Sequence, residues 1–348
     1  MLLSSTKSPT DAIEQPKALQ NNECMLCGST LEVVLSGLTD NRLGSLGSYE
    51  IRRCVHCGLE QTFPTPSVSE LKELYETYYN FGGETGTRYT RWRERFLFSF
   101  LYRMWIWLDG DVAFHQRRGA GRLLDIGCNE GRGLRLYARN GFKVEGLELN
   151  ETAAAVARKA GFDVHTGLIE EFNPVNGYDV AVLSNVLEHS LDPQKMLRDV
   201  QRILAPGGQV WISCPNNQSW LRKVFGLSWL NWHVPFHIFH FSPKTLRRLL
   251  EDTGFVKIQL SQITPALWVT QSLLVHLFAR KGKKTRQMRN PFLTLFFMIF
   301  ARFVLFPVLW RQNRLGRGDC LLAVATKERP VATVVKQAQF CSCVRTNV

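Results

Sequence analysis

The stretch LLDIGCNEGRG, from Leu123 to Gly133, joins an apolar run to a turn of small residues and then to a helix. The turn reads Gly127-x-Asn129-x-Gly131, and glycine adopts a positive φ without steric cost. Asparagine tolerates a positive φ better than most residues, so Asn129 can stand where a glycine is expected. The N-terminus of the following helix favours anionic or polar groups. The stretch therefore predicts a ligand-binding loop at the end of a buried strand.

The type of loop is narrowed by the residues around it. The spacing differs from the G-x-G-x-x-G of dinucleotide loops, Asp125 precedes the first glycine, and no Lys-Ser/Thr of a P-loop follows. Glu148 ends the next apolar run, about 20 residues further on, where a carboxylate can accept hydrogen bonds from both hydroxyls of a ribose. These residues predict a ligand that contains a nucleoside.

Outward from this loop, short apolar runs alternate with helical stretches. Such alternation predicts an α/β fold with a doubly wound, mainly parallel sheet and helices on both faces. The expected strands cover 122–126, 143–149, 163–165, 178–184, 209–213 and 319–326. The expected helices cover 132–140, 151–160, 193–204 and 242–255.

The sequence resembles the class I S-adenosylmethionine-dependent methyltransferases, whose first-strand motif is typically D-x-G-C-G-x-G. The matching segments are DIGCNEG, YDVAVLSNVLEH, LAPGGQVWISCPN and PFHIFHFSPKTLRRLLEDTGF. The resemblance covers residues 120 to about 265, with 318–327 as the seventh strand. It implies a Rossmann-like sheet whose last strand is antiparallel, and S-adenosylmethionine as the cofactor.

The resemblance also implies roles for seven residues of this chain. Small residues of the turn would approach the amino-acid part of the cofactor, an acid would order the turn, and another would hold the ribose. A position where the family often has an acid facing the adenine amine carries leucine here, which implies apolar and backbone contacts to the adenine. A residue just past the fourth strand would line the methyl-donor pocket. The small residues of the turn are Gly127, Asn129 and Gly131. The acid that orders the turn is Asp125, and the acid that holds the ribose is Glu148. Leu168 stands at the adenine position, and Asn185 lines the methyl-donor pocket.

Two C-x-x-C-G pairs precede the sheet. Cys24 and Cys27 are separated from Cys54 and Cys57 by 26 residues. Four thiolates at this spacing suit tetrahedral Zn²⁺, and a glycine after each pair permits a tight turn. A redox role would call for a helix start in a βαβ unit, which this segment lacks. A closed Cys₄ site has no open position for catalysis, so we expect a structural zinc ribbon over residues 23–66.

Candidate catalytic residues follow the fourth and fifth strands. Transfer of a methyl group to a hydroxyl benefits from a base, and histidine titrates near neutral pH. His237 in PFHIFHF is the leading candidate and His189 in NVLEH the second. For His189 a structural alternative is open, because Glu188 and His189 can simply hold the loop after the fourth strand. The fourth strand carries no N/D-P-P-Y motif, which disfavours methylation of a base or amide nitrogen by that route.

The acceptor is expected to be small or lipid-linked, such as a glycan intermediate or an isoprenoid quinone, with O-methylation favoured. One alternative is an RNA or protein methyltransferase that uses the zinc ribbon for recognition. Another is a catalytically inactive protein that binds zinc and cofactor without turnover.

The remaining segments are assigned by composition. Residues 1–22 suggest a flexible leader, 67–118 a helical segment rich in aromatic residues, and 328–348 a disordered tail, with the methyltransferase domain over 119–327. The first residues of the sequence do not have the pattern of a secretory signal peptide, so we expect a cytoplasmic protein. In that reducing compartment, paired cysteines more often bind a metal than form disulfides. An apolar helical hairpin is expected over 264–312.

The charge of this hairpin bears on the partner. The net charge of the chain is +13, and the loop ARKGKKTRQMRN between the two apolar runs has six basic residues and no acid. A hairpin lying on the inner face of a membrane, near anionic head groups, fits this pattern. An internal lid or a dimer interface is the alternative. Because the basic loop joins apolar helices, lipid is favoured over nucleic acid.

Overall fold

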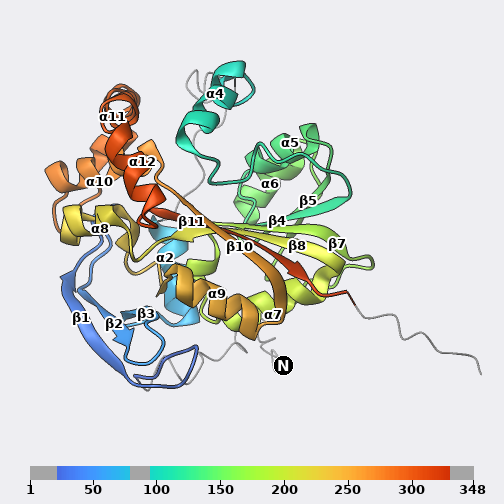
Figure 1. Ribbon diagram of the computed structural model, residues 1–348, viewed down its shortest axis with the longest axis horizontal. Coiled ribbons are helices and arrows are strands. Elements are labelled where there is room, and N and C mark those ends of the chain that lie inside the picture. The colour runs from blue at the N-terminus through green and yellow to red at the C-terminus, as the bar shows by residue number, and fades with distance from the viewer. Residues whose placement is uncertain (1–21, 79–94, 330–348) are drawn as a thin grey trace, which may run out of the picture.

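The computed structural model describes residues 22–78 and 95–329 (Figure 1). The expected leader, apart from residue 22, and the expected tail, apart from residues 328 and 329, lie outside this range. The larger of two sheets has seven strands in the order β10-β11-β8-β7-β4-β5-β6. Their bounds are Arg122–Ile126 (β4), Lys143–Glu148 (β5), Val164–Thr166 (β6), Tyr178–Ser184 (β7), Leu204–Pro215 (β8), Phe255–Ile263 (β10) and Cys320–Lys327 (β11).

The sheet has the predicted doubly wound topology. Strands β4 to β8 pair in parallel, while β11 is antiparallel to both β8 and β10. Helices α5 and α6 cover one face and α7 and α9 the other (Figure 1). Their bounds are Arg132–Arg139 (α5), Glu151–Lys159 (α6), Pro193–Ile203 (α7) and Pro243–Asp252 (α9). The predicted fold class, with its antiparallel last strand, is confirmed.

The strand order determines where a ligand can bind. From β4 the chain adds β5 and β6 on one side, and then returns to add β7 and β8 on the other. In such sheets the crevice lies beyond the carboxyl ends of the strands at this reversal. Leu123 and Leu124 of β4 and Val182 and Leu183 of β7 are fully buried, and because neighbouring strand residues point to opposite faces, both strands are buried on both faces of the sheet. The candidate site therefore begins where β4 and β7 end.

The cysteine-containing segment, residues 22–66 and here called the cysteine module, forms most of the second sheet. Strands β1 (Leu31–Leu38), β2 (Tyr49–Cys54) and β3 (Glu60–Phe63) pair in antiparallel fashion. The fourth strand, β9 (Phe239–His240), comes from the segment after β8 and pairs with β3. The cysteine module is thus continuous with the segment that carries His237.

Residues 67–118 were expected to be helical and aromatic. Within the described residues they contain α2 (Val68–Tyr78) and α4 (Phe100–Asp109). After β8 the chain forms the short helix α8 (Trp220–Phe225) and two 3₁₀ turns before it reaches β9.

The insertion between β10 and β11 contains three helices rather than a two-helix hairpin. They are α10 (Ala266–Phe278), α11 (Pro291–Phe303) and α12 (Phe306–Arg314). The second apolar run is broken because Pro307 cannot donate a backbone hydrogen bond and fits only in the first turn of a helix. The chain bends by 65° at the break between α11 and α12.

Candidate active site

The turn after β4 adopts the backbone conformation that its residues suggested. Gly127, Asn129 and Gly131 have φ values of 72°, 51° and 75°, all in the left-handed region. A Cβ atom on Gly127 would lie 2.8 Å from Cγ2 of Val186, which belongs to the loop after β7. The turn is therefore packed directly against the end of β7, and only glycine fits at its first position.

Glu148 lies beside this turn at the end of β5. Its Oε2 accepts a hydrogen bond from the backbone N–H of Asn129 at 2.8 Å, and its Oε1 accepts one from the N–H of Asn150 at 2.9 Å. Two backbone donors thus hold the carboxylate in one orientation. This geometry places an acceptor of two hydrogen bonds next to the positive-φ turn.

Asp125 is buried at the end of β4. Burial, with the nearby charge of Glu148 as a smaller cause, raises the pKa of Asp125 to about 7. Its Oδ2 would lie 2.9 Å from a Cβ atom on Gly133, so the carboxyl group faces the first turn of α5.

Leu168 and Asn185 lie past the ends of two other strands. Leu168 is half-buried in the turn after β6, and its carbonyl accepts a hydrogen bond from the N–H of Glu171 at 3.2 Å. Asn185 follows β7 with φ 55°, and its N–H donates to the carbonyl of Ser213 at 2.9 Å. Both residues lie at the same carboxyl edge of the sheet as the turn.

A cluster of acid and imidazole groups lies immediately beyond Asn185. Glu188 and His189 belong to a 3₁₀ turn, Leu187–His189, and His237 precedes β9. One potential ligand atom from each of the three side chains lies within 4.8 Å of the other two. The rings of His189 and His237 are 4.7 Å apart, and those of His233 and His237 are 4.8 Å apart. We call Glu188, His189 and His237 the Glu-His cluster.

Burial controls the charges in the Glu-His cluster. It raises the pKa of Glu188 to about 8, and neither carboxylate oxygen hydrogen-bonds to another described residue. Burial also lowers the pKa of His189 to about 4 and that of His237 well below its usual range. Both imidazoles are therefore neutral at pH 7, and Glu188 is mainly protonated there.

The neighbours of the histidines determine which ring nitrogens are available. Nδ1 of His237 is 2.8 Å from the carbonyl oxygen of Asn231, and Nδ1 of His189 is 2.9 Å from the hydroxyl of Tyr75. A carbonyl can only accept, so Nδ1 of His237 carries the proton and Nε2 keeps a lone pair. A neighbour that fixes the tautomer in this way is typical of histidines that bind metals.

Comparison with known families agrees with this geometry. Residues 89–260 match the family model described as a methyltransferase domain. The chain belongs to the class I S-adenosylmethionine-dependent methyltransferases.

Three curated relatives illustrate the similarity. The methyltransferase is 32% identical over 123 residues to a ubiquinone biosynthesis O-methyltransferase of Sodalis glossinidius, covering 32% of this chain and 49% of the relative. It is 30% identical over 156 residues to the protein of that description from Aeromonas salmonicida, covering 41% and 66%. A probable S-adenosylmethionine-dependent methyltransferase of Mycolicibacterium smegmatis is 33% identical over 156 residues, covering 43% and 59%. The chain thus spans about half to two thirds of these relatives.

Solved structures are more distant. A methyltransferase from Archaeoglobus fulgidus has 20% identity and a TM-score of 0.41, covering 69% of this chain and 100% of that one. Phosphoethanolamine N-methyltransferase 2 of Haemonchus contortus has 19% identity and a TM-score of 0.47, covering 78% of this chain and 62% of that one.

The four cysteines of the methyltransferase's cysteine module converge. Their sulfur atoms all lie within 4.8 Å of one another, with 3.4 Å between Cys24 and Cys57 and 3.5 Å between Cys27 and Cys54. Thiolates placed tetrahedrally about 2.3 Å from Zn²⁺ would be roughly 3.8 Å apart. The glycines that follow the two pairs, at positions 28 and 58, have φ values of 69° and 81°. The donor set and its spacing fit one tetrahedral ion.

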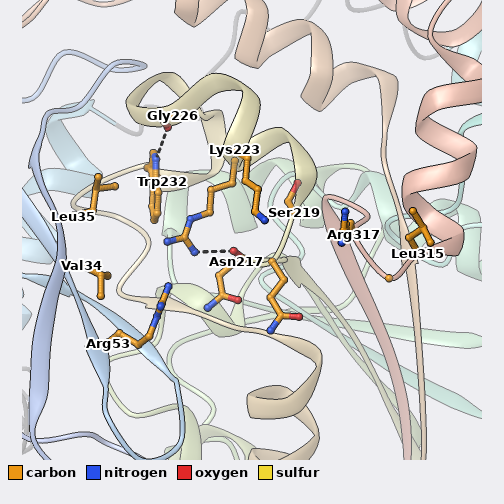
Figure 2. Close-up of a pocket in the computed structure, with 13 residues that line it drawn as sticks. Val34, Leu35, Arg53, Asn217, Ser219, Lys223, Gly226, Trp232, Leu315 and Arg317 are labelled. Atoms are coloured by element: carbon orange, nitrogen blue, oxygen red, sulfur yellow. Dashed lines mark hydrogen bonds between the residues drawn. The ribbon is translucent and has the colours of Figure 1, made fainter.

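A cleft of about 560 Å³ lies between β1 and α8 (Figure 2), and no residue of the turn after β4 lines it. Its lining includes four basic residues and no acidic one: Arg53, Arg222, Lys223 and Arg317. Arg222 donates to the carbonyl of Asn217 at 2.7 Å and lies 4.6 Å from the ring of Trp232. Trp232 in turn contacts His240, at a ring separation of 5.3 Å.

Two features of the site were not expected from the sequence. The sequence predicts for Glu188 only that it can hold the loop after the fourth strand. No sequence pattern predicts a role for Tyr75. The residue types in NVLEH carry a weak signal for Glu188, because carboxylate and imidazole are both metal ligands. Tyr75 lies 114 residues before His189, and only tertiary packing brings it there.

Proposed function

We propose that this methyltransferase transfers the methyl group of S-adenosylmethionine to a hydroxyl oxygen of a small, aromatic, quinone-like acceptor. The observation that carries the proposal is the Glu-His cluster. Its Glu188 and His189 belong to the loop after β7, in which Val186 packs on the Gly127 turn. The relatives named as ubiquinone biosynthesis O-methyltransferases support the acceptor class.

For the cofactor, we propose the arrangement that the family resemblance implies. Glu148 would accept hydrogen bonds from the ribose with the lone pairs that its bonds from Asn129 and Asn150 leave unused. The amino-acid part would lie along Gly127, Asn129 and Gly131, with the Asp125 carboxyl below the turn. Leu168 would contact the adenine, and Asn185 would line the space around the methyl group.

For the acceptor, we propose that Glu188, His189 and His237 bind a divalent cation. The Glu188 carboxyl, which has no described hydrogen-bond partner, and two neutral imidazoles form a donor set that carries one negative charge once Glu188 releases its proton on metal binding. Such a set suits Mn²⁺ or Zn²⁺. Such an ion, when bound, lowers the pKa of a coordinated hydroxyl. His237 and His189 then act as ligands rather than as the base expected from sequence, because their burial disfavours the imidazolium form.

The four cysteines are proposed to bind a structural Zn²⁺. Residues of the cysteine module support the segment that carries His237: Thr62 Oγ1 donates to the carbonyl of His237 at 2.7 Å, and Thr62 N–H donates to the carbonyl of Ile238 at 2.9 Å. Zinc would therefore act on catalysis through the position of His237.

A second acceptor class is favoured by the basic cleft. Lys223 and Arg317 suit a phosphate group, and Leu315 offers exposed apolar surface beside them (Figure 2). A phosphorylated or lipid-linked glycan would combine these features. The methyl group would then go to a sugar hydroxyl, and Lys223→Gln would slow this reaction while leaving methylation of a catechol unchanged.

Labelled methyl transfer tests the proposed function. The purified full chain is incubated with methyl-labelled S-adenosylmethionine, Mn²⁺ and an alkylated catechol, and the product is analysed by mass spectrometry. We expect a monomethyl ether, formed by wild type and by the surface variant Glu251→Gln but not by Glu188→Gln. Label in RNA or protein, or cofactor binding without transfer to any hydroxyl compound, would overturn the proposal.

A further inference from the structure

The insertion presents apolar side chains to the outside. Every exposed residue of α11 is apolar, and the set is Pro291, Phe292, Leu295, Phe296, Ile299, Phe300 and Phe303. Phe292, Phe296 and Phe303 are 83%, 64% and 65% exposed. A helix on the surface of a globular protein normally turns such a stripe inward and its polar residues outward. The orientation of α11 is the reverse, and a contiguous patch of this kind marks an interaction surface.

Helix α4 extends this patch from a distant part of the sequence. Phe100 and Trp107 are 73% and 78% exposed. At the end of α4, Asp109 Oδ1 accepts a hydrogen bond from the N–H of Ala266 at 2.7 Å, which joins α4 to the start of α10. Helices α4 and α11 reach the same end of the molecule, the upper end in Figure 1. We call the exposed apolar residues of α4 and α11 the apolar face.

The charge of the insertion is as one-sided as its hydrophobicity. Residues 264–318 contain ten lysines and arginines and no aspartate or glutamate, while the net charge of the whole chain is +13. Six of the ten lie in the loop between α10 and α11, and all six are exposed: Arg280, Lys281, Lys283, Lys284, Arg286 and Arg289. The partner of this surface must therefore be both apolar and anionic.

We propose that the apolar face and the basic loop dock on an anionic lipid bilayer, with α11 lying in the plane of the interface. Exposed Phe and Trp with lysine and arginine alongside are the composition of interfacial helices. Nucleic acid would match the charge but would leave an aliphatic and phenylalanine stripe in water.

The helix lengths favour lying on the bilayer over crossing it. Among the described residues no single helix is long and apolar enough to span a membrane. Helix α11 has 13 residues, about 20 Å at 1.5 Å per residue, against roughly 30 Å of hydrocarbon. Its continuation, α12, turns away by 65°. Both ends of the insertion also return to adjacent strands, β10 and β11, on one side of any membrane.

This inference goes beyond the proposed function, because it depends on neither the acceptor nor turnover. The test is flotation of the full chain with phosphatidylcholine vesicles that contain or lack phosphatidylglycerol. The first variant replaces Phe292, Phe296 and Phe303 with serine, and the second replaces Lys281, Arg286 and Arg289 with glutamine. The matched control is Val33→Ser with Val175→Ser, which removes two exposed apolar residues outside α4 and the insertion. S-adenosylmethionine affinity is measured for each variant as a check of folding.

We expect wild type and the control to float only with anionic vesicles, and both test variants to lose binding while keeping their cofactor affinity. The charge variant should weaken binding on the order of 100-fold, since each basic residue near an anionic surface contributes about a factor of five. The proposal is overturned if wild type does not bind vesicles, or if either test variant binds as well as wild type. A dimer in solution that the phenylalanine variant dissociates, without vesicle binding, would also overturn it and assign the face to a second copy of the chain.

Discussion

The two halves of the candidate active site are built in different ways. Most of the cofactor half lies in one stretch of sequence, from Asp125 to Glu148, in which the N–H of Asn129 donates to Glu148 only 19 positions further on. Leu168 and Asn185 complete this half from the ends of two other strands. The acceptor half takes Tyr75 from α2, Glu188 and His189 from the loop after β7, and His237 from the segment before β9. Local backbone geometry determines the first half, while packing between distant elements determines the second. Mutations in the two halves should therefore have separable effects.

The largest effect is expected in the acceptor half. Glu188→Gln keeps the shape of the side chain but removes the only carboxylate of the Glu-His cluster. Loss of a group that activates the acceptor typically costs about 10²–10⁴-fold in rate. We expect kcat to fall by this amount while the Kd for S-adenosylmethionine changes less than about twofold. Stopped assays and calorimetric titration would measure both, and a parallel loss of cofactor affinity would show that the two halves are not separable.

The next largest effect is expected at Glu148. Replacement by alanine removes two charge-assisted hydrogen bonds to the ribose, and each is worth about 1.5–3 kcal/mol. We expect the Kd for S-adenosylmethionine to rise by at least about 100-fold. The kcat at saturating cofactor should stay within about threefold of wild type. If binding is unaffected, the ribose lies elsewhere and the proposed cofactor orientation is wrong.

Loss of zinc from the cysteine module should have an intermediate effect. It should lower kcat, which depends on the acceptor half, more than it lowers the affinity for the cofactor. Cys54→Ser should abolish stoichiometric zinc and lower Tm by at least about 5 °C, because a structural ion contributes directly to folding. The kcat should fall more than cofactor affinity, since Thr62 holds the carbonyl of His237. His56→Ala is the matched control, because His56 lies between two ligands yet is exposed. Metal analysis and thermal melts that fail to separate these two variants would contradict a zinc site.

The smallest effects are expected in the turn itself. Asn129 has φ 51°, which glycine also adopts, so Asn129→Gly should change the cofactor Kd by less than about threefold. Asn129→Val places a β-branched residue in the left-handed region, at a cost of about 1–3 kcal/mol. In calorimetry and thermal melts, the glycine variant should therefore match wild type in cofactor affinity and Tm. The valine variant should have a lower affinity and a lower Tm than both. Equal behaviour of the two variants would mean that the backbone of the turn differs from that described.

The same contrast explains how far the sequence could predict the molecule. Strands β4 and β7 have the bounds predicted, because a buried strand of a parallel sheet is a continuous apolar run bounded by turn residues. The positive φ of Asn129 was also predictable from residue type. Strand β8 begins at Leu204, five residues before the predicted start, because Ala205–Gly208 continue the strand through a register shift. The pairing of β3 with β9 and the contact of Tyr75 with His189 join segments more than 100 residues apart, for which no local pattern exists.

The most direct test of the account is the metal dependence of one wild-type preparation. Cofactor Kd and the rate of catechol methylation are measured after weakly bound ions are removed with a mild chelator, and again after Mn²⁺ is added. Zinc content is monitored so that the cysteine module stays loaded. The account predicts that methylation falls by at least about 100-fold on chelation and returns with Mn²⁺, while the Kd for S-adenosylmethionine stays within twofold. Full activity in the chelated protein would contradict a cation at Glu188, His189 and His237.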